Sequence, residues 1–248
     1  REDVMEQLSL GLPMGFQMSI IAIGTIVLQY AINGLGSEAV ASFTAGSRVE
    51  GLAMTPLQAF GMAIATYVAQ NRGAGQWARI RKGVGQTAWL TIAISVTVGF
   101  VCIVWGEHMV RAFAGGDEHA DSIIAQAHVL LVVSGLCFTS LGLLFVFRSA
   151  LQGLGHSGIP TLSGVVELVL RSAVALTLVG PLGFLGACIA APAAWVGALI
   201  PLWISWEKRR RELLGWEREA AEMAALREAE DNTTLPDGDR GREVAVTS

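Results

Sequence analysis

The chain has 248 residues, of which 52% are hydrophobic and 15% charged, and its formal net charge at pH 7 is −4. Soluble domains carry about 25% charged residues, so the composition argues against an ordinary soluble domain. Ionisable residues are also sparse from residue 10 to 206 and dense from 207 to 248, a distribution typical of a membrane protein with a charged tail.

Six apolar segments, taken in chain order, are each long enough to cross a bilayer, which requires about 20 residues. They lie at about residues 10–32, 52–70, 86–105, 123–147, 159–179 and 182–206. A soluble domain of this length does not bury six helices that are apolar on all sides. The sequence therefore predicts an all-α membrane protein with one six-span unit over residues 1–206.

Basic residues between the spans predict their orientation. The connection after the second span holds Arg72, Arg79, Arg81 and Lys82, and the end of the sixth span holds the basic run 208–211. The connections on the other side hold few basic residues. This alternation predicts a multi-pass protein of the plasma (inner) membrane with both termini in the cytoplasm.

The segment VAQNRGAGQWARIRKG has two interpretations. Its Gly73-Ala74-Gly75 is similar to the start of a dinucleotide-binding loop, but that loop follows a strand and has a third glycine, whereas residue 78 is Ala and both flanks are apolar spans. We therefore interpret the segment as a connection held at the membrane surface by its basic residues. No metal-ligand cluster or nucleophile–base arrangement is visible, so we expect no enzyme, no cofactor and no nucleic-acid partner.

Four stretches occur in a familiar order: LGLPMGFQMSI, SRVEGLAMTPLQAFGMAIATYVAQNRGAG, RSALQGLGHSGIP and SGVVELVLR. Together, over about residues 8–206, they resemble the carboxy-terminal lobe of the multidrug and toxic compound extrusion (MATE) family of efflux transporters. The resemblance implies one six-helix lobe of a two-lobe, twelve-helix transporter, in a chain that is a fragment lacking the amino-terminal lobe. A first residue of Arg rather than Met agrees with truncation.

The same resemblance implies secondary active multidrug efflux, in which organic cations or amphipathic compounds are exchanged for sodium or a proton. Some members carry a coupling acid in the first helix of this lobe. Here residues 10–37 contain no Asp or Glu, and Ile21 aligns with the acidic position. Coupling is then expected to depend on acids of the absent lobe, and the coupling ion is not identifiable.

Five side chains of the first two spans are candidates for the substrate pathway, because Met repacks around varied shapes and the resemblance places these helices along a central cleft. They are Met14, Gln17, Met18, Gln58 and Met62. The alternative is ordinary helix packing, with the two amides bonded to neighbouring helices. The sequence leaves both possibilities open.

Glu167 and Arg171 lie near the middle of the fifth span, four residues apart on one helix face. A lone charge there costs about 2.5–3.5 kcal/mol, so the two are expected to form an intramembrane ion pair. The pair is either proton-sensitive and gated or a static clasp, and we favour the clasp because the spacing lets the charges neutralise each other. Arg48, Glu50 and Arg148 lie near predicted span ends, so we expect them to extend to water.

Residues 207–230 predict a juxtamembrane amphipathic helix, because apolar residues recur there every three or four positions. Residues 231–248 have a composition typical of a disordered tail. Two other functions are weighed: a flippase for a lipid-linked precursor, which calls for clustered basic side chains in the cleft, and a membrane scaffold without a transported substrate.

Overall fold

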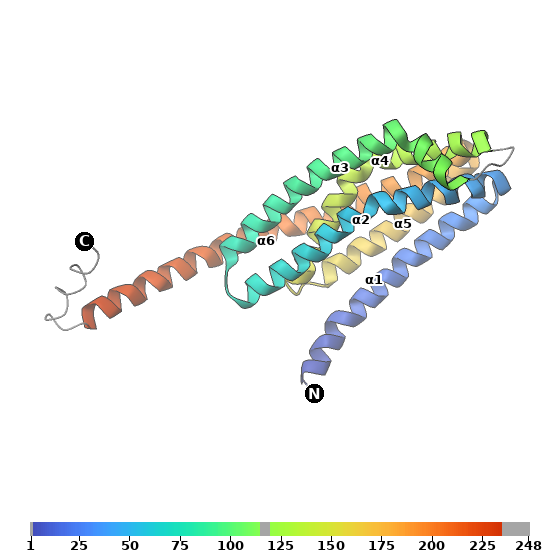
Figure 1. The fold of residues 1–248 in the computed structure, drawn as a ribbon. Helices are drawn as coiled ribbons and strands as arrows, with labels where there is room; N and C mark the ends of the chain where they lie inside the picture. Colours follow the sequence, from blue (N-terminus) through green and yellow to red (C-terminus); the bar gives the residue numbers. More distant parts are fainter. Residues whose placement is uncertain (1, 115–119, 235–248) are drawn as a thin grey trace.

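Over the residues that the structure describes, the computed structural model consists of six α-helices (Figure 1). The backbone is described for residues 2–114 and 120–234, and the side chains for residues 11–12, 15–112 and 121–226. The helices are α1 (Glu2–Asn33), α2 (Ser37–Gly73), α3 (Trp77–Ala114), α4 (Ala120–Gly153), α5 (Gly158–Leu182) and α6 (Phe184–Thr234). Each contains a stretch long and apolar enough to cross a membrane. The predicted all-α fold with six spans is confirmed.

The helices are longer than the predicted spans, because polar residues next to the span ends are also helical. Helix α2 begins at Ser37 rather than near residue 52, so Arg48 and Glu50 lie inside it, and α4 continues past Arg148 to Gly153. Glu50 and Arg148 are each only 8% exposed, so the expectation that they extend to water is wrong. Hydropathy detects lipid-facing surface, and it misses helical turns whose polar side chains pack against other helices.

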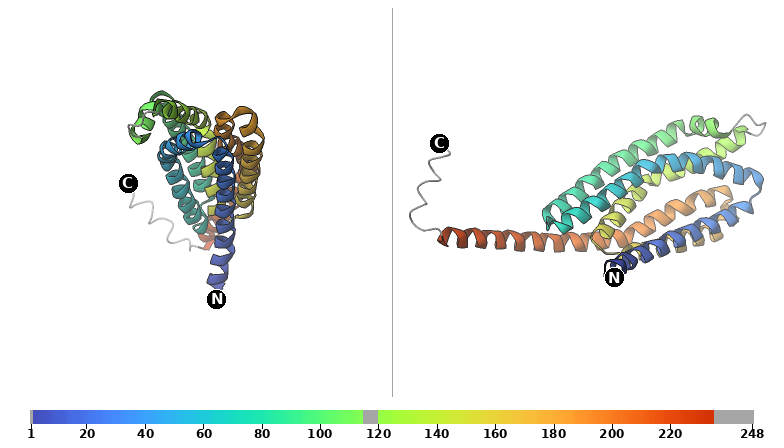
Figure 2. Two further views of the ribbon diagram at one scale, coloured as in Figure 1. Left: turned by 90° about the vertical axis from the view of Figure 1, so that its right-hand side faces the viewer. Right: turned by 60° about the horizontal axis from the view of Figure 1, so that its bottom comes forward.

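The helices form two groups that meet along α4 and α6. Helices α2, α3 and α4 pack together, α5 packs against both α1 and α6, and α4 joins the groups through its contacts with α6. Helices α1 and α2 touch little, mostly near their shared turn, where Leu28, Ile32 and Ala39 belong to one apolar cluster. Figure 2 shows α1 running beside α5 while α2 lies with α3.

Small residues let α3 and α4 approach closely. A Cβ added to Gly99 of α3 would lie 2.5 Å from the carbonyl oxygen of Gly135 in α4, so the crossing has no space for a side chain. Small residues at such crossings are typical of membrane helices, where van der Waals packing drives association. This contact therefore holds α3 and α4 close together within the group of α2, α3 and α4.

The turn between α2 and α3 contains Gly75, whose φ of 66° suits glycine. This turn lies at the same end of the bundle as the start of the α6 tail, where Arg81 donates a hydrogen bond to Glu217 at 3.3 Å (Figure 1). Helix α6 leaves the bundle as one continuous helix to Thr234, beyond the predicted boundary at residue 230. The rest of the predicted tail, 235–248, lies outside the described residues.

Candidate functional site

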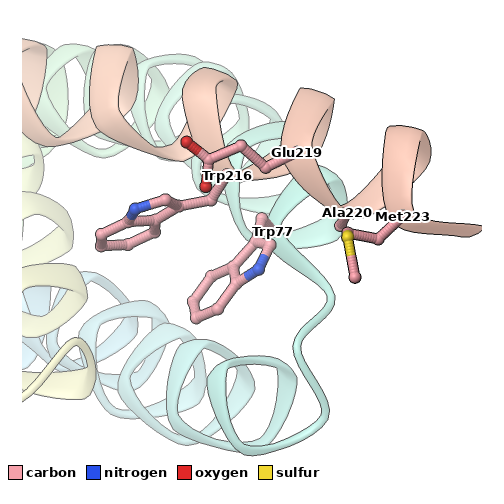
Figure 3. A pocket seen from close by; sticks show the side chains of 5 residues that line it. All are labelled: Trp77, Trp216, Glu219, Ala220 and Met223. Atoms are coloured by element: carbon pink, nitrogen blue, oxygen red, sulfur yellow. The ribbon is translucent and has the colours of Figure 1, made fainter.

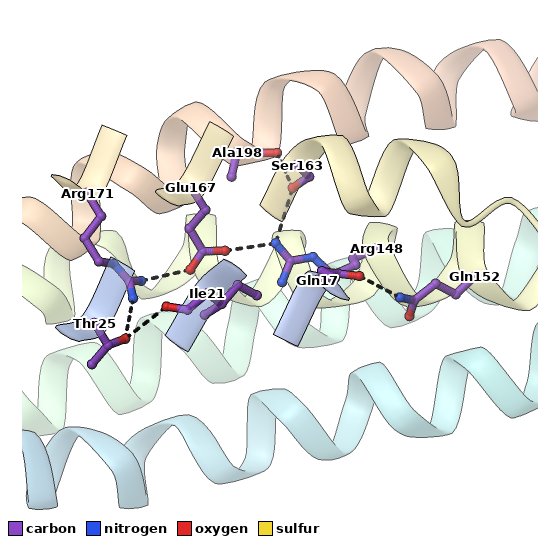
Figure 4. Close-up of polar contacts among 9 residues, drawn as sticks. All are labelled: Gln17, Ile21, Thr25, Arg148, Gln152, Ser163, Glu167, Arg171 and Ala198. Atoms are coloured by element: carbon purple, nitrogen blue, oxygen red, sulfur yellow. Dashed lines mark hydrogen bonds and ion pairs between the residues drawn. The ribbon is translucent and has the colours of Figure 1, made fainter. Parts of the chain in front are cut away.

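A buried charge network joins α4 and α5 (Figure 4). The carboxylate of Glu167 accepts one hydrogen bond from Arg148 Nη2 at 3.0 Å and another from Arg171 Nη2 at 2.8 Å. Exposure is 8% for each arginine and 5% for the glutamate. Two guanidiniums against one carboxylate leave one surplus positive charge. We call these three residues the charge network.

Hydrogen bonds extend the charge network to two further helices. Arg171 Nη1 donates to Thr25 Oγ1 of α1 at 3.1 Å. Arg148 Nη2 also donates to Ser163 Oγ at 3.3 Å, and that hydroxyl donates to the carbonyl oxygen of Ala198 in α6 at 3.0 Å. Because α4 and α5 touch little elsewhere, the Arg148–Glu167 bond is a principal link between them.

The charge network retains hydrogen-bonding capacity. Among the described residues, the buried Nε atoms of Arg148 and Arg171 have no partner, and neither does the buried Oε1 atom of Glu50 in α2. Buried polar atoms in proteins are nearly always bonded. The two Nε atoms are therefore unused hydrogen-bond donors within the charge network. Within the described residues, no cluster of three or more His, Cys, Asp or Glu is placed to hold a metal ion.

The residues predicted to line the pathway differ in exposure. Gln17 is only 4% exposed, and its Oε1 accepts a hydrogen bond from Gln152 Nε2 of α4 at 3.2 Å. Met18 and Met62 are 70% and 74% exposed, and Gln58 is exposed as well. Met14 lies in α1 outside the residues whose side chains are described. Consecutive residues of a helix point about 100° apart, which separates Gln17 from Met18.

Sequence reasoning missed the interior position of Arg148 and its bond to Glu167. The predicted fourth span ended at residue 147, yet α4 continues through Gln152 to Gly153. The signal that could have placed the helix end is Gly155, whose φ of 77° marks the turn into α5. No local signal indicates that Arg148 pairs across helices with a residue of α5.

The MatE family model matches residues 13–177 of this chain. The probable multidrug resistance protein NorM of Thermotoga maritima is 27% identical over 198 residues, covering 78% of this chain and 40% of that protein. The probable multidrug resistance protein YoeA of Bacillus subtilis is 21% identical over 210 residues, covering 82% of this chain and 44% of that protein. The chain thus spans less than half the length of these relatives.

Solved structures show the same fold. A crystal structure of MATE in complex with MaL6 matches with a TM-score of 0.79 and 18% identity, covering 87% of this chain and 48% of that chain. The inward-facing conformation of a multidrug resistance MATE family transporter matches with a TM-score of 0.75 and 18% identity, covering 87% of this chain and 50% of that chain. The six helices therefore correspond to about half of such a structure.

Proposed function

The chain belongs to the MatE family, and on that premise we propose that it forms one lobe of a transporter that expels amphipathic organic cations in exchange for a coupling cation. The family consists of membrane transporters rather than enzymes. The observation that carries the proposal is the family match together with a six-helix fold equal to about half of a MATE chain. We assign the chain to the carboxy-terminal lobe, because its motif order resembles that half.

The uncovered faces of α1 and α2 are the proposed substrate surface. Met18, Gln58 and Met62 are exposed and contribute little to packing within this lobe. Flexible thioethers beside one amide suit loose recognition of varied cations. A second six-helix lobe, which we propose as the partner within the same polypeptide, would close the cleft over these residues.

We propose a different role for Gln17 and the charge network, which is to hold the lobe together. The amide of Gln17 is bonded to α4, and Glu167 bridges α4 and α5. Buried, hydrogen-bonded charged groups keep their partners unless the helices separate. On this proposal they move as a rigid unit during alternating access. The acid that binds the coupling ion belongs to the partner lobe.

Transport in proteoliposomes tests the proposal. The full-length protein is reconstituted, a sodium or a pH gradient is imposed, and movement of a fluorescent organic cation is followed. We expect movement against the substrate gradient that stops when an ionophore dissipates the driving ion. Substrate movement that is independent of both gradients would refute antiport. A complete lack of substrate movement would favour a scaffold.

Paired substitutions test the proposed surface. Met18→Ala with Met62→Ala should raise the KM for the organic cation about fivefold, equivalent to about 1 kcal/mol of lost contact, with little change in maximal rate. The matched control is Leu90→Ala with Val96→Ala, two exposed apolar residues of α3. Equal KM changes in both pairs would remove the special role of α1 and α2.

A further inference from the structure

A hollow lies at the end of the lobe where α6 leaves the bundle. It is lined by the end of α2, the start of α3, the α4–α5 turn and α6, and its volume is about 340 Å³. Small-molecule pockets range over about 300–1,000 Å³, so the hollow lies near the lower end of that range and is large enough for a lipid headgroup. We call it the tail pocket.

Positive charge dominates the tail pocket. Its lining includes Arg72 at the end of α2, His156 in the α4–α5 turn and Arg209 of α6. Among the described side chains, Arg72 forms no salt bridge, whereas Arg209 pairs with Glu212. The pocket therefore offers one unshared guanidinium and one that is partly neutralised.

The same two arginines also act on the histidine of the pocket lining. His156 lies in the connection between α4 and α5, outside both helices. Burial lowers its pKa, and the positive charges of Arg209 and Arg72 lower it further, while Glu212 acts in the opposite direction. Burial is the larger cause of this shift, so the preference of the pocket for an anion rests on its two guanidiniums rather than on His156.

Two indoles form a wall of the tail pocket. The ring centroids of Trp77 and Trp216 are 4.9 Å apart with an interplanar angle of 55° (Figure 3). The adjacent Arg81–Glu217 ion pair fastens α3 to α6 at this wall. The same indoles also line a more open groove of about 380 Å³ (Figure 3), which has Glu219 and no basic side chain in its lining. The preference for an anion thus belongs to the tail pocket.

We propose that the tail pocket binds the phosphoryl anion of an anionic phospholipid headgroup, with the guanidiniums of Arg72 and Arg209 as its ligands. Arginine donates paired hydrogen bonds that match phosphate oxygens. The pocket also lies where helix α2 ends, at Gly73, and helix α5 begins, at Gly158. The ends of membrane-spanning helices are expected near the membrane–water interface, where tryptophan is enriched.

Lipid binding by the purified full-length protein tests the inference without any transport measurement. Native mass spectrometry would count bound phosphatidylglycerol and phosphatidylcholine as each lipid is added. We expect tighter binding of phosphatidylglycerol, weakened about fivefold by each of Arg72→Gln and Arg209→Gln and about 25-fold by both together. Similar affinity of the unmodified protein for the two lipids would overturn the proposal.

A matched control separates the tail pocket from general surface charge. Arg79→Gln with Lys82→Gln also removes two positive charges from this end of the lobe, but from residues outside the pocket lining. An equal loss in this control would overturn the proposal. His156→Phe fills the pocket without removing an arginine, and it should also weaken binding. Displacement of the lipid by an equal concentration of inorganic phosphate would overturn a lipid source for the anion.

Discussion

Replacing Glu167 by Gln tests whether the charge network is a structural clasp. The substitution keeps the shape of the side chain, but it removes the negative charge that two buried guanidiniums share at 3.0 and 2.8 Å. Each charge-assisted hydrogen bond contributes about 1.5–3 kcal/mol, so the loss of two amounts to about 3–6 kcal/mol. Removing one partner of a buried ion pair costs about 3–5 kcal/mol by an independent estimate.

We therefore expect Glu167→Gln to lower the free energy of unfolding by about 4 kcal/mol, close to a thousandfold change in the ratio of folded to unfolded protein. Equilibrium unfolding in mixed micelles of mild detergent and SDS, followed by circular dichroism, would measure it. The matched control is Glu217→Gln, which breaks the half-buried surface pair with Arg81. Surface pairs contribute about 0–1 kcal/mol, so this variant should differ little from the unmodified protein.

A structural clasp is refuted if Glu167→Gln loses no more stability than the control. A gate predicts a different pattern from a clasp. If the charge network were a gate, Glu167→Gln would shift the pH dependence of transport and leave the free energy of unfolding nearly unchanged, because a gate must exchange partners easily. Measuring stability and transport on the same variant therefore distinguishes the two roles that the sequence left open.

Three smaller effects follow from the same structure. Gly99→Ala should destabilise the protein by about 1–3 kcal/mol because its Cβ would meet a carbonyl of α4, whereas Gly85→Ala, which meets nothing within 4 Å, should be neutral or stabilising by mixed-micelle unfolding. A double-mutant cycle of Gln17→Leu and Gln152→Leu should give a coupling energy of about 0.6 kcal/mol, and zero coupling would contradict the hydrogen bond. The folded state lowers the pKa of His156 from 6.5, so the unfolded state binds a proton at this histidine first as the pH falls. The free energy of unfolding should therefore drop from about pH 7 downwards, and it should drop less in His156→Asn.

The sequence located the helices well and their ends poorly. Lipid-facing apolar runs identified all six spans, because a span must be apolar wherever it meets hydrocarbon. The start of α2 and the end of α4 were misplaced, since Glu50 and Arg148 are polar residues in helix that faces protein. Burial of a charge depends on its partner, and the partner of Arg148 is 19 positions away in the chain.

The contacts of the candidate site were likewise predictable from the sequence only where they are local. A spacing of four residues was enough to predict that Glu167 and Arg171 share a helix face, because that geometry is local. Whether Gln17 or Met18 faces the interior depends on how α1 is rotated against α5. That rotation is set by packing along the whole helix, which a pattern of methionines and amides does not specify.

The sequence by itself determined that the chain lies in a lipid bilayer and that it forms six helices, with basic residues gathered at alternate connections. These properties follow from composition and local periodicity, because hydrocarbon admits only apolar, internally bonded backbone. Only the tertiary structure decided which polar side chains are covered and which meet. Such contacts join residues far apart in the chain, and they arise when helix axes are placed and rotated against one another.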